Sequence, residues 1–152
     1  MVTSDCTIYV NDEGTTRQYD GKSDGPIPYI DFSTLVEKDC IHLEKSTSMN
    51  FEDSRDYCHG LPGGGDLFVA GDLTGMTQYL ATEVPDKHVI IGAFIKNGQN
   101  KWLDGRSVTN QELIPDKSHN NECFQVKSNK MMHTHECNKK EYFLCQKGVE
   151  FL

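Results

Sequence analysis

The sequence predicts an α+β fold in a single domain. Two helix-forming segments lie between about residues 50 and 85, and short strand-forming segments joined by turns follow from residue 89 onward. Helices grouped ahead of strands are typical of α+β proteins, whereas βαβ units would alternate along the chain. A chain of 152 residues with 36% hydrophobic residues can form one hydrophobic core of ordinary size. It is too short to form two such cores.

The first 39 residues differ from the rest of the chain. A β-branched and aromatic run, TIYV at residues 7–10, meets the turn-forming residues NDEG at 11–14. We therefore expect an N-terminal hairpin and extension, residues 1–39, packed on a domain formed by residues 40–147. Residues 148–152 are expected to form a C-terminal tail.

A first helix is predicted immediately after Asn50. The Asn50 side chain can cap a helix that begins at Phe51, with Asp53 at the third helical position in a capping-box-like arrangement. Phe51, Ser54 and Cys58 then fall near one helical face, so a short helix ending near Cys58 is expected.

A glycine-rich segment, residues 60–66, interrupts the helical pattern. It resembles a phosphate-binding loop only superficially, because it lacks the following Lys-Ser/Thr pair and follows a helix rather than a strand. We interpret it as a turn. Asp72 can then cap a second helix, which Pro85 stops. Three apolar residues recur at positions i, i+3 and i+7 of that helix: Leu73, Met76 and Leu80.

The second half of the chain carries short strand-forming segments. An apolar run at residues 89–95 is followed by a turn at 96–99 and by the segment KWLDG at 101–105. Two further strand-like segments are FQV at 124–126 and YFL at 142–144. This half is therefore predicted to be a set of strands joined by turns.

The composition disfavours several partners. The net charge of −8, from 23 acidic and 15 basic residues, repels polyanions, and no Lys/Arg-rich block offsets it locally. Neither nucleic acid nor an anionic membrane surface is an expected partner. The longest apolar runs reach seven residues, far below the ~20 that cross a bilayer, so no membrane span is expected.

The six cysteines indicate an oxidising compartment. They form an even set in an acidic, loop-rich domain, and their spacings match no common intracellular metal motif. The first residues show neither the basic nor the apolar region of a signal peptide. We therefore expect a secreted, extracellular protein from which a signal has been removed.

Five short segments follow one another in a characteristic order: FEDSRDYC at 51–58, GGDL at 64–67, IIGA at 90–93, WLDG at 102–105 and YFLC at 142–145. In this order and spacing they resemble the C-type lectin-like domain, over about residues 40–147. The segment Ile90 to Ala93 occupies the place where that family usually has Trp-Ile-Gly-Leu. The choice of motifs is similar to that of secreted arthropod members.

The resemblance implies the disulfide pairs Cys58–Cys145 and Cys123–Cys137. In the chain-entropy model the first contributes about 4–5 kcal/mol of stability and the second about 3 kcal/mol. The pair Cys6–Cys40 is also implied, as in family members with an extra N-terminal hairpin bridge. The implied fold has two helices, antiparallel sheets and a long loop. The disulfides cross-link this fold.

The segment at residues 120–137 has two interpretations, a metal site or a disulfide-closed loop. It combines two cysteines with two histidines: Cys123, Cys137, His133 and His135. Cysteine ligation of zinc needs thiolates, which an oxidising compartment removes, and the spacing does not fit a CxxC-type knuckle. A closed loop is therefore favoured. Histidines alone, with His119 nearby, could still bind zinc or respond to pH, beside the simpler interpretation that they are exposed polar residues.

The calcium cage of sugar-binding family members is incomplete in this sequence. Calcium needs about six to eight oxygen ligands, several of them carboxylates. The family's proline tripeptide corresponds to residues 114–116, where isoleucine replaces an oxygen ligand, and its Trp-Asn-Asp tripeptide corresponds to residues 132–134. Asn121 stands where the family has an acid, so only Asp116 supplies a charged oxygen at a matching position. We therefore expect no cofactor, with calcium disfavoured. Weak metal candidates are Asp116, Glu122, His133 and His135.

The resemblance implies recognition of glycans or microbial surfaces through residues 109–134, as in innate immune pattern recognition. The alternative is a protein-binding module or a hetero-oligomer subunit that binds no sugar. Candidate carbohydrate-binding residues are Pro115, Asp116, His119, Asn120, Asn121, Glu122, His133 and Thr134.

Catalysis is not expected. No Ser/His/Asp or Cys/His grouping stands out once the cysteines are assigned to disulfides, and the acidic pairs are interpreted as solvated helix faces. Trp102 is either a core anchor or an exposed platform for a sugar ring. As the single tryptophan, placed in a sheet motif, it is interpreted as a core anchor.

Overall fold

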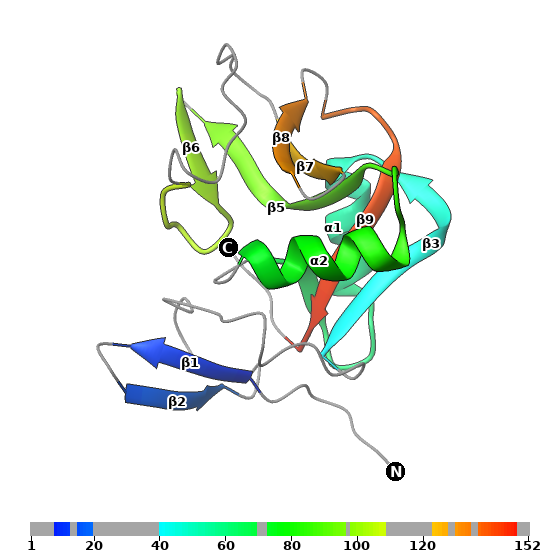
Figure 1. Ribbon diagram of the computed structural model, residues 1–152. Coiled ribbons are helices and arrows are strands. Elements are labelled where there is room, and N and C mark those ends of the chain that lie inside the picture. Colours follow the sequence, from blue (N-terminus) through cyan, green and yellow to red (C-terminus); the bar gives the residue numbers. More distant parts are fainter. Residues whose placement is uncertain are drawn as a thin grey trace.

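The computed structural model describes residues 8–12, 15–19, 40–69, 73–96, 98–108, 123–127, 130–134 and 137–148. In this part of the chain, two helices and nine strands form the α+β fold that the sequence predicts (Figure 1). The predicted first half, two helices and a glycine-rich connection, precedes most of the strands. One long strand, β3 (Ile41–Met49), comes before both helices and was not predicted.

The N-terminal strands form a sheet of their own. β1 (Ile8–Asp12) and β2 (Thr15–Tyr19) pair antiparallel, and the register pairs Asp12 with Thr15. The first strand therefore runs through Asn11 and Asp12, which were expected in the turn, and leaves only two residues for the connection. The domain boundaries and the packing of residues 1–39 on the domain stay predictions.

Seven strands form the main sheet. Their order is β3-β9-β5-β7-β8, with β4 paired to β9 and β6 paired to β5. All pairs are antiparallel except β5 with β9, which run parallel. The remaining strands are β4 (Gly65–Leu67), β5 (Val89–Lys96), β6 (Gln99–Trp102), β7 (Cys123–Lys127), β8 (Lys130–Thr134) and β9 (Glu141–Lys147).

The first helix begins where the sequence predicts. α1 (Phe51–His59) has Asn50 as its N-cap, and the Asn50 side-chain oxygen accepts a hydrogen bond from the Asp53 backbone N–H at 2.8 Å. The predicted inward face is buried: Phe51, Ser54 and Cys58. The acidic residues of the helix that we interpreted as solvated are exposed: Glu52, Asp53 and Asp56.

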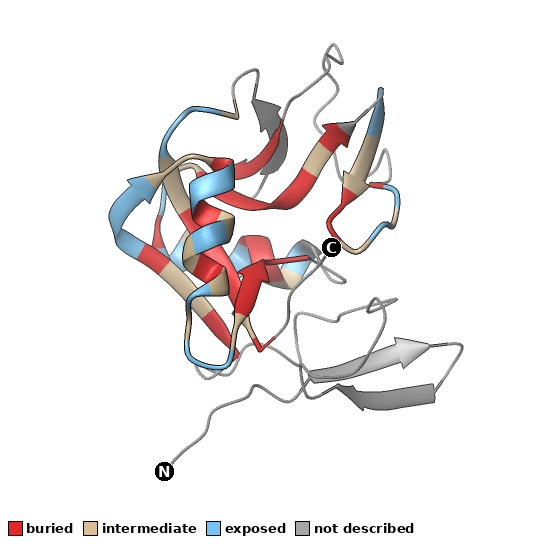
Figure 2. Cartoon of the chain, turned by 180° about the vertical axis from the view of Figure 1, so that it is seen from behind, coloured by how far each residue is buried: buried red, intermediate tan, exposed pale blue. Residues whose placement is uncertain are grey.

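The second helix, α2 (Leu73–Glu83), lies where it was predicted, while its predicted cap, Asp72, lies outside the described residues. Met76 and Leu80 are buried, and the helix ends two residues before Pro85. The buried residues gather along the central strands and on the inner faces of the helices (Figure 2). The core therefore lies between the main sheet and the two helices.

The glycine-rich segment is a turn only as far as Gly64. Residues 65–67 form strand β4, so the prediction of a turn through Asp66 is wrong at its end. Glycine makes this strand possible, because a Cβ at Gly65 would lie 2.7 Å from the Cys58 carbonyl oxygen and 3.0 Å from that of Gln146. The missing side chain thus lets the chain pass tightly between α1 and β9.

Two disulfides fasten the fold as the family resemblance implied. Cys58–Cys145 joins α1 to β9 across 87 residues, and Cys123–Cys137 closes the β7–β8 region across 14 residues. These cysteines are therefore unavailable as thiolate ligands, which leaves the closed-loop interpretation. Cys40 is disulfide-bonded, and its predicted partner Cys6 lies outside the described residues.

Gly92 in β5 marks a second close approach of two backbones. A Cβ at this position would lie 2.9 Å from the carbonyl oxygens of both Leu67 and Phe68. The Gly92 N–H donates a hydrogen bond to the Phe68 carbonyl at 2.8 Å, so the two segments cannot separate without losing that bond.

We expect Gly92→Ala to destabilise the protein by about 1–3 kcal/mol, because rigid backbone would have to shift to accept the methyl group. Gly60→Ala is the matched control, since its φ is −84° and its new Cβ would meet only ordinary contacts at 3.6 Å. Urea denaturation with the disulfides intact measures both. Equal midpoints for the two variants would contradict the close approach.

Candidate functional site

The predicted glycan-binding residues lie mostly outside the described residues. This applies to Pro115, Asp116, His119, Asn120, Asn121 and Glu122, and also to the weak metal candidate His135. His133 and Thr134 lie in β8, where the backbone is described. The structure does describe the elements from which the long loop, residues 109–122, departs and to which it returns.

The loop returns to the sheet through a hairpin. Cys123 directly follows Glu122 and pairs with Thr134, and Phe124 pairs with His133. The register therefore brings the end of the loop to the two β8 residues that correspond to the family's Trp-Asn-Asp tripeptide. Cys123 and Phe124 are both buried, and Phe124 is buried completely. The disulfide from Cys123 to Cys137 also restrains this end of the loop.

The start of the loop, like its end, adjoins a residue that is anchored to the sheet. Val108, its last described residue, is buried and donates a backbone hydrogen bond to the Asn100 carbonyl in β6 at 3.0 Å. β6 and β7 both pair with β5, so the two ends of the loop start from neighbours of one central strand. Val108 and Cys123, the two described residues that flank 109–122, are therefore both anchored to the main sheet.

Trp102 lies in β6, the strand to which Val108 is hydrogen-bonded. Its side chain is 1% exposed, which confirms a core anchor and excludes the exposed sugar platform. Asp104 accepts hydrogen bonds from the Arg106 backbone N–H at 3.0 Å and from its Nε at 2.9 Å. These bonds hold the Arg106 guanidinium 5.8 Å from the centre of the tryptophan ring, within reach of a cation–π interaction.

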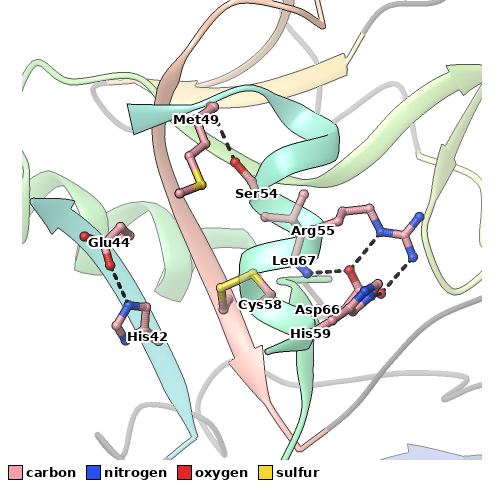
Figure 3. Close-up of a disulfide and its surroundings, with 10 residues drawn as sticks. His42, Glu44, Met49, Ser54, Arg55, Cys58, His59, Asp66 and Leu67 are labelled. Carbon is pink, nitrogen blue, oxygen red and sulfur yellow. Dashed lines mark hydrogen bonds and ion pairs between the residues drawn. A yellow bond between two sulfur atoms is a disulfide. The ribbon is translucent and has the colours of Figure 1, made fainter. Parts of the chain in front are cut away.

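A buried carboxylate fixes α1 against β4. Asp66 is fully buried and accepts two parallel hydrogen bonds from Arg55, at 2.9 and 2.8 Å (Figure 3). The Leu67 N–H donates a third bond at 2.8 Å, and His59 Nε2 lies 3.2 Å from the other carboxylate oxygen. The hydrogen bond to Asp66 raises the pKa of Arg55. The pair has the geometry of a structural clamp, because such bidentate pairing satisfies a buried charge.

A second polar cluster lies on β3. Burial raises the pKa of the Glu44 carboxyl, but hydrogen bonds to the ionised form outweigh burial and lower the pKa to about 2. Three side chains hydrogen-bond this carboxylate: His42, Ser46 and Tyr57. The hydrogen bond to Glu44 in turn raises the pKa of Tyr57. No sequence pattern marks this cluster, because its members come from two separate elements, β3 and α1.

Other kinds of site are limited in the described part of the chain. No group of three or more His, Cys, Asp or Glu residues there is arranged to hold a metal ion. No helix in the described ranges is long and apolar enough to span a bilayer.

The described residues thus form an α+β domain cross-linked by disulfides. The family model for the lectin C-type domain matches residues 47–147, about two thirds of the chain. The chain belongs to the C-type lectin domain family. Domains of this family are generally non-enzymatic binding modules and are often extracellular.

Solved structures of similar fold include C-type lectin domains. The mouse scavenger receptor C-type lectin carbohydrate-recognition domain is 19% identical, with a TM-score of 0.59 over 74% of this chain and 91% of that chain. The C-type lectin domain of murine dendritic cell inhibitory receptor 2, in complex with N-glycan, is 14% identical, with a TM-score of 0.57 over 70% and 88%. SPL-1 in complex with GlcNAc is 15% identical, with a TM-score of 0.61 over 72% and 87%. At these identities the likeness shows the fold alone. No curated protein matches the sequence.

The Glu44 cluster predicts a specific acid sensitivity. Because the folded-state pKa of about 2 lies below the ordinary value of 4.5, the ionised carboxylate stabilises the fold above about pH 4.5, and this contribution is lost as the pH falls toward 2. Glu44→Gln should lower stability at neutral pH by on the order of 1–3 kcal/mol and flatten the loss between those pH values.

Urea denaturation at about pH 7 and about pH 3 measures this effect. Glu52→Gln, which removes an exposed carboxylate from α1, is the control and should retain the pH dependence of the wild type. If the free energy of unfolding falls equally in both variants on acidification, the role assigned to the Glu44 carboxylate is contradicted.

Proposed function

We propose that this protein is a secreted recognition protein that binds glycans or microbial surfaces through residues 109–134, without the family's usual calcium cage. One sequence observation carries the proposal. Pro115-Asp116 is kept beside a polar stretch, Ser118 to Asn121, whose side chains can hydrogen-bond sugar hydroxyls directly. The anchoring of both loop ends supports it, because a fixed base reduces the ordering entropy that a binding loop loses.

The substitutions in the cage support a metal-free mode. Ile114 supplies no oxygen, and His133 and Thr134 replace an amide and a carboxylate of the family pattern. A doubly charged ion would then face one carboxylate, Asp116, at the matching positions, which leaves most of its charge uncompensated. Direct hydrogen bonds would then hold the sugar. Asp116 and Glu122 would accept them from sugar hydroxyls, and His119, Asn120 and Asn121 could donate or accept them.

An extracellular role in innate immune recognition fits this proposal. Structural disulfides are typical of proteins in oxidising compartments, and the family's domains are often extracellular. The net charge of −8 favours neutral or cationic surface polymers over polyanionic ones.

A second candidate is a protein-binding module or hetero-oligomer subunit. The loss of cage ligands favours it, because a protein interface needs no cation. Purification of complexes from the native secreted fluid, followed by mass spectrometry, separates the two functions. A stoichiometric protein partner together with no glycan retention would replace the first proposal by the second.

Calcium should leave the stability of the protein unchanged. A cation that binds only the folded state must raise its apparent stability, and 1 kcal/mol corresponds to a Tm shift of about 2–4 °C at this chain length. We expect Tm values in millimolar calcium and in chelator to agree within about 1 °C. The same scan with zinc tests the histidine candidates, His133 and His135. A clear upward shift in calcium would restore the ordinary cage.

Glycan binding should depend on the loop and not on calcium. On a glycan array, we expect the same pattern in calcium and in chelator, and loss of about tenfold or more in retention for a double variant, Asp116→Asn with Asn121→Ala. Asn138→Ala, at an exposed position after Cys137, is the control for removing a surface amide. An array without binding in either condition, or a control as weak as the double variant, would contradict the proposal.

A further inference from the structure

A hollow separate from the long loop lies where α1 meets the end of β3 and the residue before β9. Its volume is about 500 Å³, within the range of small-molecule sites. Six residues line it: Ser48, Met49, Asp53, Asp56, Tyr57 and Lys140. None of them belongs to the proposed glycan-binding loop.

The hollow has side chains of opposite character on two sides. Asp53 and Asp56 are three residues apart on α1 and therefore share one helical face, which we call the acid wall. Ser48 and Lys140 come from the β3–β9 side, where Met49 pairs with Glu141, and both can donate hydrogen bonds. We call this pair the donor wall. Among the described residues, no ion pair joins the two walls, although both line the same hollow.

Tyr57 forms a fixed surface of the hollow beside the acid wall. Its hydroxyl is hydrogen-bonded to the buried carboxylate of Glu44. Its ring meets Phe143 edge-on, with centroids 5.3 Å apart, and lies 5.7 Å from the His42 ring. A tyrosine held at both its ring and its hydroxyl cannot swing away, so the aromatic surface is in place before any ligand arrives.

The arrangement of charge restricts the ligand. A cation alone would be attracted by the acid wall and by the tyrosine ring, but Lys140 would repel it. An anion alone would be held by Lys140 and repelled by two carboxylates. A ligand that carries both charges is attracted by both walls, although the hollow is open and four of its six lining residues are exposed to solvent.

We propose that this hollow binds a small zwitterionic group, with its ammonium end against the acid wall and the Tyr57 ring and its anionic end against the donor wall. The thioether of Met49 supplies an apolar surface for the carbon atoms between the two charges. The inference goes beyond glycan recognition and does not depend on it, because the ligand contains no sugar.

Phosphocholine is the probe, because it joins a quaternary ammonium to a phosphate over a short carbon link. Titration of the ¹⁵N-labelled full chain, followed by amide chemical shifts, should perturb residues 48–57 and 140. Choline alone and inorganic phosphate alone should bind at least about tenfold more weakly than phosphocholine. A methyl glycoside in a fourth titration tests a neutral polyol.

Matched variants separate the two walls from general charge. Asp53→Asn with Asp56→Asn, and separately Lys140→Gln, should each weaken phosphocholine binding by about tenfold or more. Glu52→Gln removes a neighbouring carboxylate on α1, and Lys139→Gln a neighbouring ammonium, and both should stay within about twofold of wild type. Neither control residue lines the hollow. A thermal melt of each variant verifies folding.

Three results would overturn the inference. The first is an absence of shifts in residues 48–57 at about 10 mM phosphocholine. The second is equal binding of choline alone, which would make the site a simple cation site, or of the glycoside, which would make it a sugar site. The third is equal weakening by the wall variants and their controls. If the wild type binds phosphocholine and the glycan array is empty, this inference stands and the proposed glycan function fails.

Discussion

The arrangement of this domain depends on the closing strand, β9. It pairs with β3, β4 and β5, and Cys145 within it forms the disulfide to Cys58 of α1. Residues 143–146 are completely buried, so the strand contributes both the backbone ladder and the centre of the core. Because its partners come from residues 41 to 96, the chain cannot complete the sheet until its last segment returns. The disulfide across 87 residues lowers the conformational entropy of the unfolded chain. It therefore reduces the entropy that is lost when this long segment of chain is closed.

Two buried carboxylates, from Asp66 in β4 and Glu44 in β3, position α1 against the main sheet. Asp66 is held by Arg55 in two parallel bonds, and Glu44 accepts the hydroxyl of Tyr57. Each buried carboxylate would destabilise the fold if it lost its hydrogen-bond partner on α1. Each therefore favours the position of the helix in which that hydrogen bond is made. The same placement turns Asp53, Asp56 and Tyr57 toward the hollow, so structural and candidate binding side chains alternate along one short helix.

Local signals in the sequence predicted the helices well. The Asn50 cap and the 3.6-residue spacing of Met76 and Leu80 act over a few residues, and the structure confirms them. The parallel pairing of β5 with β9 and the short strand β4 could not be predicted in the same way, because they depend on segments far apart in sequence. Acidic residues are normally exposed, so nothing local marked Asp66 as buried. The loop candidates came from the family resemblance, whereas the hollow is assembled from three segments and was missed.

The anchors on either side of residues 109–122 would let the fold stay intact if the calcium cage is absent, as we propose. The loop leaves from Val108 and returns at Cys123, and both residues are buried beside strands that pair with β5. Phe124 and the disulfide to Cys137 hold the return point without any ligand in the loop. The contacts named here are made by residues on either side of 109–122, so these anchors do not depend on which charges that segment offers to a ligand. The identity of a ligand therefore depends on the chemistry of the residues at its site, and the likeness of the fold to sugar-binding structures does not decide it.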